Sequence, residues 1–221
     1  MGIAKYSYQW NFFKQPSENL YYFLGFVAAD GYVSNCDIEI GINQKDKYLL
    51  EHFRDLIVPD KPLYYKEKSD AYILKISCRN RIKDFKSFYG MQTSKKCYEV
   101  QFPQDIPQEY YKDFIRGYID GDGCIDTTKG YKKDKVYIGP RLRILGNHDF
   151  LRDMNEKTKE FVHHNTNAIL KKGHENIYYV TYNFSTAKKL LKWLYDDSII
   201  CLSRKKDRVL ELCSWRYSLL P

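Results

Sequence analysis

Two stretches of the chain carry nearly the same string of residues. Residues 22–33 read YFLGFVAADGYV and residues 114–125 read FIRGYIDGDGCI, so that Asp30 matches Asp122. Three further matches follow in the same order: 38–50 with 141–151, 72–89 with 178–195, and 93–100 with 202–209. The separation between partners only grows along the chain, as loop insertions in a duplicated domain would produce. This repeat constrains the fold most strongly, because both halves must adopt one plan.

The plan expected in each half is αββαββα. The helices are predicted at 17–30, 46–57 and 79–89, and again at 107–122, 149–162 and 186–196. Ser17 and Ser185 are the expected N-caps, and Pro107 suits a first helical turn. Strand pairs are expected after each first helix and at 63–78 and 168–184, with turns near Ser69-Asp70 and Gly173-His174. Residues 127–139 are predicted to be a polar, Lys-rich loop.

The linker is expected in VQFPQDIPQ, residues 100–108, which contains two prolines. The predicted domains are therefore 1–102, with an N-terminal extension at 1–16, and 103–221. The fold class is α+β, with two antiparallel sheets related by a pseudo-two-fold axis.

Strand alternation gives each sheet an apolar face and a polar face. Ile38, Ile40 and Ile42 point one way, and Leu142 and Ile144 do the same in the second half. The polar face is rich in cations, and two such faces side by side suit a groove for duplex DNA. The residues expected to contact DNA are Glu39, Asn43, Lys66, Lys68, Lys75, Ser77, Arg141, Arg143, Lys172, Thr181 and Asn183.

Small residues recur four apart in both first helices. Gly117 and Gly121 share one face of the helix at 107–122, and Gly25 and Ala29 occupy the matching places. This spacing lets two helix backbones approach closely. We therefore expect the two helices to pack on each other as the interface between the halves.

That packing is predicted to bring Asp30 and Asp122 together at the helix C-termini, with Gly31 and Gly123 as left-handed caps. A carboxylate there opposes the helix dipole, and a second carboxylate adds repulsion. No residue in the sequence pattern relieves this, so a cation is expected. Carboxylate oxygens, with backbone near Ala29 and Gly121, suit Mg²⁺, and Mn²⁺ or Ca²⁺ is expected to substitute for binding. An EF-hand is excluded, because position six from Asp120 is Ile125 and position twelve is Tyr131.

Composition limits the class of binding partner and the cellular compartment that can be expected. The chain has 36 Lys plus Arg against 28 Asp plus Glu, a net charge of +8, which favours a polyanionic partner such as nucleic acid. The six cysteines form no CxxC pair and the five histidines show no zinc-ligand spacing. No signal peptide or membrane-length apolar run is present. The expected setting is soluble and intracellular, without distinction between a bacterial or phage cytoplasm and an organelle matrix.

FLGFVAADG (23–31) and IRGYIDGDG (115–123) resemble the paired motifs of the LAGLIDADG homing endonucleases in their single-chain form. The resemblance spans nearly the whole chain. It implies a saddle of two αββαββα halves on DNA. It also implies metal-dependent cleavage of both strands across the minor groove of a long, pseudo-palindromic site, with short 3′ overhangs. An intron-encoded monomer is expected, while an intein or a free-standing gene stays open.

The resemblance also assigns site residues. The eighth motif position makes Asp30 and Asp122 the metal-binding acids, whereas Ala28 and Asp120 at the sixth position are not ligands. SKK (94–96) and SRK (203–205) imply basic residues at Lys96 and Lys205 that support charge on the phosphate. Gln44 matches a glutamine that the family often has after the second strand, where it organises the water network. Its counterpart by register is Gly146, with Asn147 beside it.

Two alternatives stay open at this point. One is a cleavage-inactive, sequence-specific DNA-binding protein, although a pure binder gains nothing from two opposed carboxylates near phosphates. The other is an RNA maturase, with intron RNA as the partner, since the basic surface serves either role.

Overall fold

The computed structural model describes residues 5–77, 79–92, 96–132, 135–172, 176–214 and 218–219. In the first half the elements are η1 (Trp10–Phe13), α1 (Glu18–Asp30), β1 (Tyr32–Val33), β2 (Asp37–Asn43), η2 (Gln44–Asp46), α2 (Lys47–Ile57), β3 (Tyr64–Lys66), η3 (Glu67–Ser69), β4 (Ala71–Ser77), α3 (Ile82–Phe88) and α4 (Lys96–Glu99). In the second half they are η4 (Gln108–Tyr110), α5 (Tyr111–Asp122), β5 (Gly123–Lys132), β6 (Lys135–Gly146), α6 (His148–Val162), β7 (Ile169–Lys171), β8 (Tyr178–Asn183), α7 (Phe184–Tyr195), α8 (Ser203–Ser214) and β9 (Ser218–Leu219).

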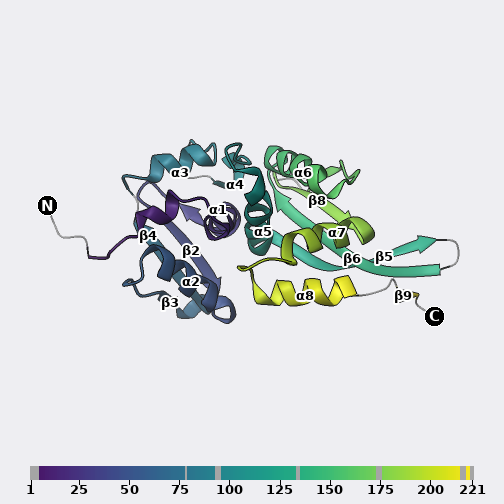
Figure 1. Ribbon diagram of the computed structural model, residues 1–221, viewed down its shortest axis with the longest axis horizontal. Helices are drawn as coiled ribbons and strands as arrows, with labels where there is room; N and C mark the ends of the chain where they lie inside the picture. Colours follow the sequence, from purple (N-terminus) through teal and green to yellow (C-terminus); the bar gives the residue numbers. More distant parts are fainter. Residues whose placement is uncertain are drawn as a thin grey trace.

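The two halves share one sheet topology. The first sheet has the order β1-β2-β4-β3 and the second the order β5-β6-β8-β7, with β9 added against β6. All of these strand pairs are antiparallel. The duplicated α+β plan predicted from the repeat is confirmed. Figure 1 shows the two sheets on either side of α1 and α5, which lie next to each other at the centre of the molecule.

The sheets have the predicted two faces. Ile38, Ile40 and Leu74 are fully buried in the first half, as are Leu142, Ile144 and Val180 in the second. The residues between them in the strands, among them Lys75 and Arg143, are exposed or half-buried. Because side chains alternate along a strand, each sheet presents its polar face away from the core.

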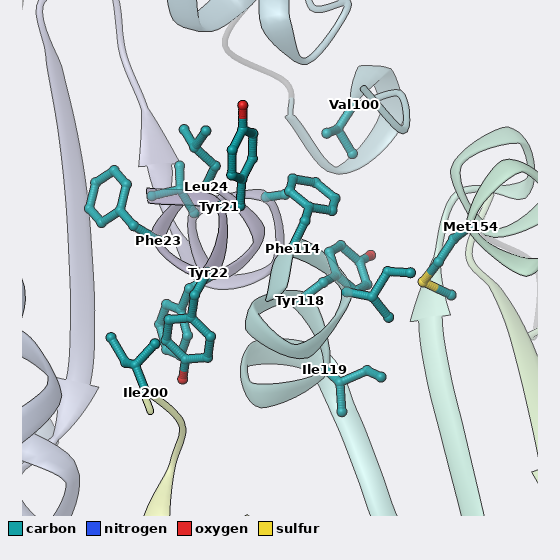
Figure 2. Close-up of a cluster of buried hydrophobic side chains, with 14 of the residues drawn as sticks. Tyr21, Tyr22, Phe23, Leu24, Val100, Phe114, Tyr118, Ile119, Met154 and Ile200 are labelled. Carbon is teal, nitrogen blue, oxygen red and sulfur yellow. The ribbon is translucent and has the colours of Figure 1, made fainter. Parts of the chain in front are cut away.

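Helices α1 and α5 pack on each other through their glycines, as the sequence predicts. A Cβ atom at Gly25 would clash with the backbone carbonyl of Phe114, and one at Gly117 would clash with that of Tyr22. Phe114 matches Tyr22 in the repeat, so the two close approaches are related by pseudo-symmetry. Figure 2 shows the large side chains that flank this crossing, including Phe23, Phe114 and Tyr118. Residues from both halves therefore share one core around the helix pair.

The glycines after the two aspartates do not act as left-handed caps. Gly31 has φ −73° and Gly123 has φ −83°, both in the extended region. Each is required for space instead. A Cβ at Gly31 would lie 2.8 Å from the carbonyl oxygen of Val27, and one at Gly123 would lie 2.6 Å from that of Ile119. The prediction of left-handed caps is therefore wrong: glycine is needed at these two positions because a side chain would clash with the last turn of the helix.

Three local predictions are wrong in the second half. Residues 127–139 are not a loop, since β5 and β6 continue through most of them as one long hairpin that extends away from the body (Figure 1). Helix α7 begins at Phe184 with Asn183 at its N-cap, so Ser185 lies inside the helix. Helix α8 was not predicted. The predicted turn at Gly173-His174 lies outside the described residues.

The N-terminal extension packs on the first half. The backbone N–H of Gln9 donates to the carbonyl of Ile57 at 2.8 Å, and the hydroxyl of Tyr8 accepts from the backbone N–H of Ser77 at 3.1 Å. Ser17 caps α1 as predicted, its side chain accepting from Leu20. Across the described residues, none of the helices has the length and apolar character that crossing a bilayer requires.

Candidate catalytic centre

The carboxyl ends of α1 and α5 meet and expose one aspartate each. Asp30 is the last residue of α1 and Asp122 the last of α5, and both are exposed. The Cβ position at Gly121, directly before Asp122, lies 3.5 Å from the Cβ of Asp30. Gly121 has no room for a side chain there, because a Cβ would clash with Ala29. The small residues at the crossing thus allow two carboxylates to approach each other at the surface.

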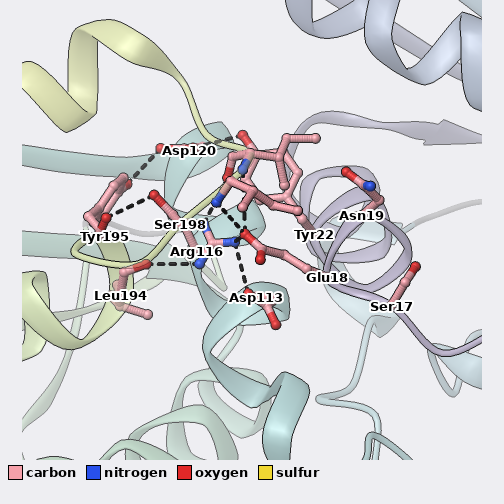
Figure 3. A network of polar contacts seen from close by, with 12 residues as sticks. Ser17, Glu18, Asn19, Tyr22, Asp113, Arg116, Asp120, Leu194, Tyr195 and Ser198 are labelled. Carbon is pink, nitrogen blue, oxygen red and sulfur yellow. Dashed lines mark hydrogen bonds and ion pairs between the residues drawn. The ribbon is translucent and has the colours of Figure 1, made fainter.

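Asp120 lies beneath this pair and is almost fully buried. Its carboxylate accepts hydrogen bonds from the hydroxyls of Tyr22 at 2.7 Å and Tyr195 at 2.6 Å, and from the backbone N–H of Leu202 at 2.8 Å. Burial raises the pKa of Asp120, while nearby Lys205 and the three donors act in the opposite direction. This carboxylate joins α1, α5, α7 and the segment before α8 (Figure 3). Its role is therefore to hold the elements around the crossing.

Arg116 is the second buried polar group at the crossing. Its side chain is 0% exposed, and its guanidinium forms ion pairs with Glu18 at 2.6 Å and Asp113 at 2.8 Å. It also donates to the carbonyls of Leu194 and Ile200. Figure 3 shows Arg116 between the two helices and the segment after α7. The guanidinium thus ties the first half to the C-terminal part of the chain.

Lys205, from the first turn of α8, caps the carboxyl end of α5. Its ammonium donates to the carbonyls of Ile119 at 2.6 Å, Asp120 at 2.8 Å and Gly123 at 2.8 Å. Burial lowers the pKa of Lys205 to about 8, and the charges of Asp120, Asp30 and Asp122 act against that shift. We expected no side chain to offset the negative charge at the helix C-termini. That expectation is wrong in the second half, where Lys205 does so.

The remaining residues predicted for catalysis lie in different surroundings. Gln44 is exposed in the short helix after β2, and its backbone N–H donates to Asp70. Asn147 is the N-cap of α6: its Oδ1 accepts from Phe150 at 2.9 Å, and its Nδ2 donates to the carbonyl of Val100 at 2.7 Å. Lys96 begins α4, and its side chain lies outside the described part of the structure.

The outer face of the second sheet is hollowed. A hollow of about 500 Å³ is lined by Arg141, Arg143, Leu145, Leu170, Lys172, Tyr179 and Thr181. Four of these residues were predicted to contact DNA. Arg141 forms a two-pronged ion pair with Asp126 across β5 and β6, at 2.7 and 2.6 Å. This pair lowers the pKa of Asp126 and engages two nitrogens of the Arg141 guanidinium.

The predicted DNA contacts in the first half are also on the outer surface. Lys75 lies 3.1 Å from the carboxylate of Asp37, and Asn43 caps the short helix η2. Lys66, Lys68 and Ser77 are exposed, Glu39 is half-buried, and Asn183 in the second half is exposed.

The donor set at the crossing fits a hard divalent cation. Both side chains are exposed carboxylates, and oxygen ligands are those that Mg²⁺ and Ca²⁺ prefer. In the described ranges no group of three or more His, Cys, Asp or Glu side chains could hold a metal ion. The two aspartates would therefore need oxygens from outside, as phosphate or water, and a site completed by a substrate is common for Mg²⁺.

Sequence reasoning missed the polar groups that support the crossing. Arg116 and Asp113 stand three apart in α5, and opposite charges at this spacing in a helix signal an ion pair. Their partner Glu18 lies in the other half, and Tyr22 and Tyr195 read as ordinary core residues. Only the fold brings these side chains together.

Comparison with protein-family models and with curated proteins found no match in either case. Comparison with solved structures found several matches over most of the chain. I-LtrWI, a LAGLIDADG homing endonuclease bound to target DNA, is 16% identical, with a TM-score of 0.59 over 88% of this chain and 89% of that chain. I-SmaMI bound to uncleavable DNA is 13% identical, with a TM-score of 0.63 over 90% and 88%. I-AabMI bound to uncleaved DNA is 14% identical, with a TM-score of 0.57 over 88% of each chain. The chain therefore has the two-half, single-chain fold of the LAGLIDADG homing endonucleases.

Proposed function

We propose that this protein is a site-specific, divalent-metal-dependent DNA endonuclease that hydrolyses one phosphodiester bond in each strand of a long duplex target. The observation that carries the proposal is the pair of exposed carboxylates, Asp30 and Asp122, at the crossing of α1 and α5. Two acids at adjoining helix C-termini repel each other, and the helix dipoles add to the local negative charge even with Lys205 at the end of α5. A cation shared with DNA phosphates would satisfy them.

Duplex DNA is the proposed partner. The neighbours I-LtrWI, I-SmaMI and I-AabMI are described as bound to DNA. This chain has a net charge of +8 and two sheets whose outer faces carry lysine, arginine and amide side chains. A polycationic surface of this kind attracts the DNA backbone, and outward strand residues can read base edges. By the same likeness, cleavage across the minor groove is proposed to leave short 3′ overhangs.

In the proposed mechanism the protein supplies the position of the ligands and the surrounding charge. Asp30 and Asp122 would hold Mg²⁺, and one neighbour was solved with calcium ions. The ion, when bound, polarises the scissile phosphate and lowers the pKa of an attacking water. The close glycine contacts of α1 and α5 fix the separation of the two helix ends that carry the aspartates. Lys96, Gln44 and Asn147 remain proposed contributors from the family resemblance.

A binding-only function is the weaker candidate, because exposed carboxylates at the centre of a DNA-facing surface would reduce affinity for phosphates. The discriminating experiment is selection from a randomised duplex library with Mg²⁺, followed by sequencing of the cut ends. Cut ends that share one long sequence motif, with a fixed stagger between strands, support the proposal. Enrichment of bound duplexes with no cut ends would support binding alone.

A further inference from the structure

All three N–H donors of the Lys205 ammonium are used by the carboxyl end of α5. The acceptors are the carbonyls of Ile119, Asp120 and Gly123, at 2.6 to 2.8 Å. A lysine ammonium has three donors and no acceptor. In this arrangement Lys205 has no remaining proton for a phosphate oxygen. Its side chain is also buried, with the residue 8% exposed.

The three carbonyls flank Asp122 on both sides. Asp120 precedes it by two residues and Gly123 follows it directly. Fixing these carbonyls fixes the backbone from which the Asp122 side chain leaves the helix. The ammonium also supplies positive charge at the helix terminus where the dipole and the carboxylate are both negative. Lys205 thus orients the Asp122 side chain and stabilises the negative charge of its carboxylate.

The position of Lys205 is itself determined by the buried network. Its backbone N–H donates to the carbonyl of Leu202 at 2.9 Å, and the N–H of Leu202 donates to the carboxylate of Asp120. The two tyrosine hydroxyls that hold Asp120 come from α1 and α7. The first turn of α8 is therefore held against α5 by Asp120, which is itself held by groups from α1 and α7.

We propose that Lys205 is a positioning residue: it fixes the carboxyl end of α5 so that Asp122 is oriented toward the divalent cation, and it does not donate to the scissile phosphate. This inference rests on the proposed function. It replaces the direct phosphate contact that the family resemblance implies for Lys205. Removing a group that orients a metal ligand typically weakens metal affinity by about 10- to 100-fold.

The test compares Lys205→Met, which removes the charge and all donors, with Lys205→Gln, which keeps two donors. Lys206→Met is the matched control, because the Lys206 ammonium donates to Ser198 and not to α5. Calcium affinity of each protein bound to its selected duplex is measured by calorimetry. Strand cleavage is then measured over a range of Mg²⁺ concentrations. The glutamine variant keeps the test valid if the methionine variant does not fold.

The expected result is a calcium dissociation constant about 10-fold or more higher in Lys205→Met, a smaller increase in Lys205→Gln and no change in Lys206→Met. The Mg²⁺ concentration for half-maximal cleavage should rise in parallel, and the rate at saturating Mg²⁺ should return to within a few-fold of wild type. Unchanged calcium affinity overturns the proposal, whether or not the cleavage rate falls. A wild-type protein that neither binds calcium nor cleaves any selected duplex contradicts the proposed function instead.

Discussion

Asp120 is a buried carboxylate that accepts three hydrogen bonds, one from the first half of the chain and two from its own half. Tyr22 donates from α1, Tyr195 from α7, and Leu202 from the segment before α8. The matching residue in the first half is Ala28, and Tyr89, which matches Tyr195, donates to the carbonyl of Leu24 instead. The two halves therefore stabilise their central helices differently, one with a carboxylate and one with a backbone acceptor.

Asp120→Asn should destabilise the protein by about 2–4 kcal/mol, because the amide nitrogen would face a donor and one buried donor would lose its partner. The free energy of unfolding is measured by urea denaturation. Asp196→Asn is the control, since Asp196 is exposed and pairs with Lys192 at the surface, where such pairs contribute about 0–1 kcal/mol. Equal losses in the two variants would contradict the assigned role of Asp120.

The pKa of Lys205 predicts how stability changes with pH. The folded protein releases this proton near pH 8, whereas an unfolded lysine keeps it to about pH 10.5. Between these values the unfolded state binds more protons, so this group raises the free energy of unfolding as pH rises. The wild type should gain up to roughly 3 kcal/mol relative to Lys205→Met from pH 8 to 10.5. A difference between the two proteins that is constant over this range would show that Lys205 is not buried as a cation.

Helices α1 and α5 were predictable because their constraint is local and steric. Glycines four apart lie on one face, and the same spacing in both halves indicates that each helix is the other's partner. Helix α8 was not predictable in the same way. Its buried positions are Lys205, Val209 and Leu212, so a lysine stands where the helical pattern calls for an apolar residue. Only the carbonyls at the end of α5 explain why a cation is buried there.

The close helix contact can be tested with a single methyl group. Gly25→Ala should destabilise by about 3 kcal/mol or more, because the added Cβ meets backbone atoms of α5 that cannot move independently. Gly41→Ala is the control: its Cβ would lie 3.8 Å from the nearest side-chain atom, an ordinary contact. Thermal and chemical unfolding are compared for the two variants. A Gly25 variant as stable as the Gly41 variant would show that the helices are not in backbone contact.

The β5–β6 hairpin makes the outer faces of the two halves unequal. Residues 135–140 of β6 precede its pairing with β8, which begins at Arg141. This stretch adds roughly 20 Å at about 3.4 Å per residue. If the sheet face follows DNA, the target should extend about six base pairs further on the side of the second half, at about 3.4 Å per pair.

Hydroxyl-radical footprinting of the bound duplex in Ca²⁺ measures this difference. Lys129→Ala combined with Lys135→Ala should shorten the protection on one side only. Protection that is equally long on both sides of the centre would contradict the prediction.

The complete chain is held together by reciprocal contacts between its halves. Asp46, before α2, pairs with Arg204 of α8 at 2.8 Å, and Tyr48 accepts from the backbone of Ser203 at 2.6 Å. On the other side, Asn147 before α6 donates to the carbonyl of Val100 at 2.7 Å. In each half, residues within or next to the last helix, α8 or α4, are thus bound by the other half. Such contacts join residues far apart in the sequence. The repeat therefore predicted the elements of each half, but it did not predict the contacts that join the two halves.

The two exposed carboxylates were predictable from the sequence, since each ends an apolar helix directly before a glycine. Their support was not, because it comes from α7, α8 and the opposite half. The long hairpin was missed for another reason: polar residues and lysines in 127–139 are typical of a loop as well as of a strand exposed on both faces.

The most direct test of the account is cleavage by Asp30→Asn and Asp122→Asn on the selected duplex in Mg²⁺. Each substitution removes one charge from the pair while keeping the size of the side chain. Double-strand cleavage should fall below detection in both variants, while duplex affinity in the absence of metal stays within a few-fold of wild type. Cleavage at the wild-type rate in either variant would contradict the claim that these two carboxylates form the catalytic centre.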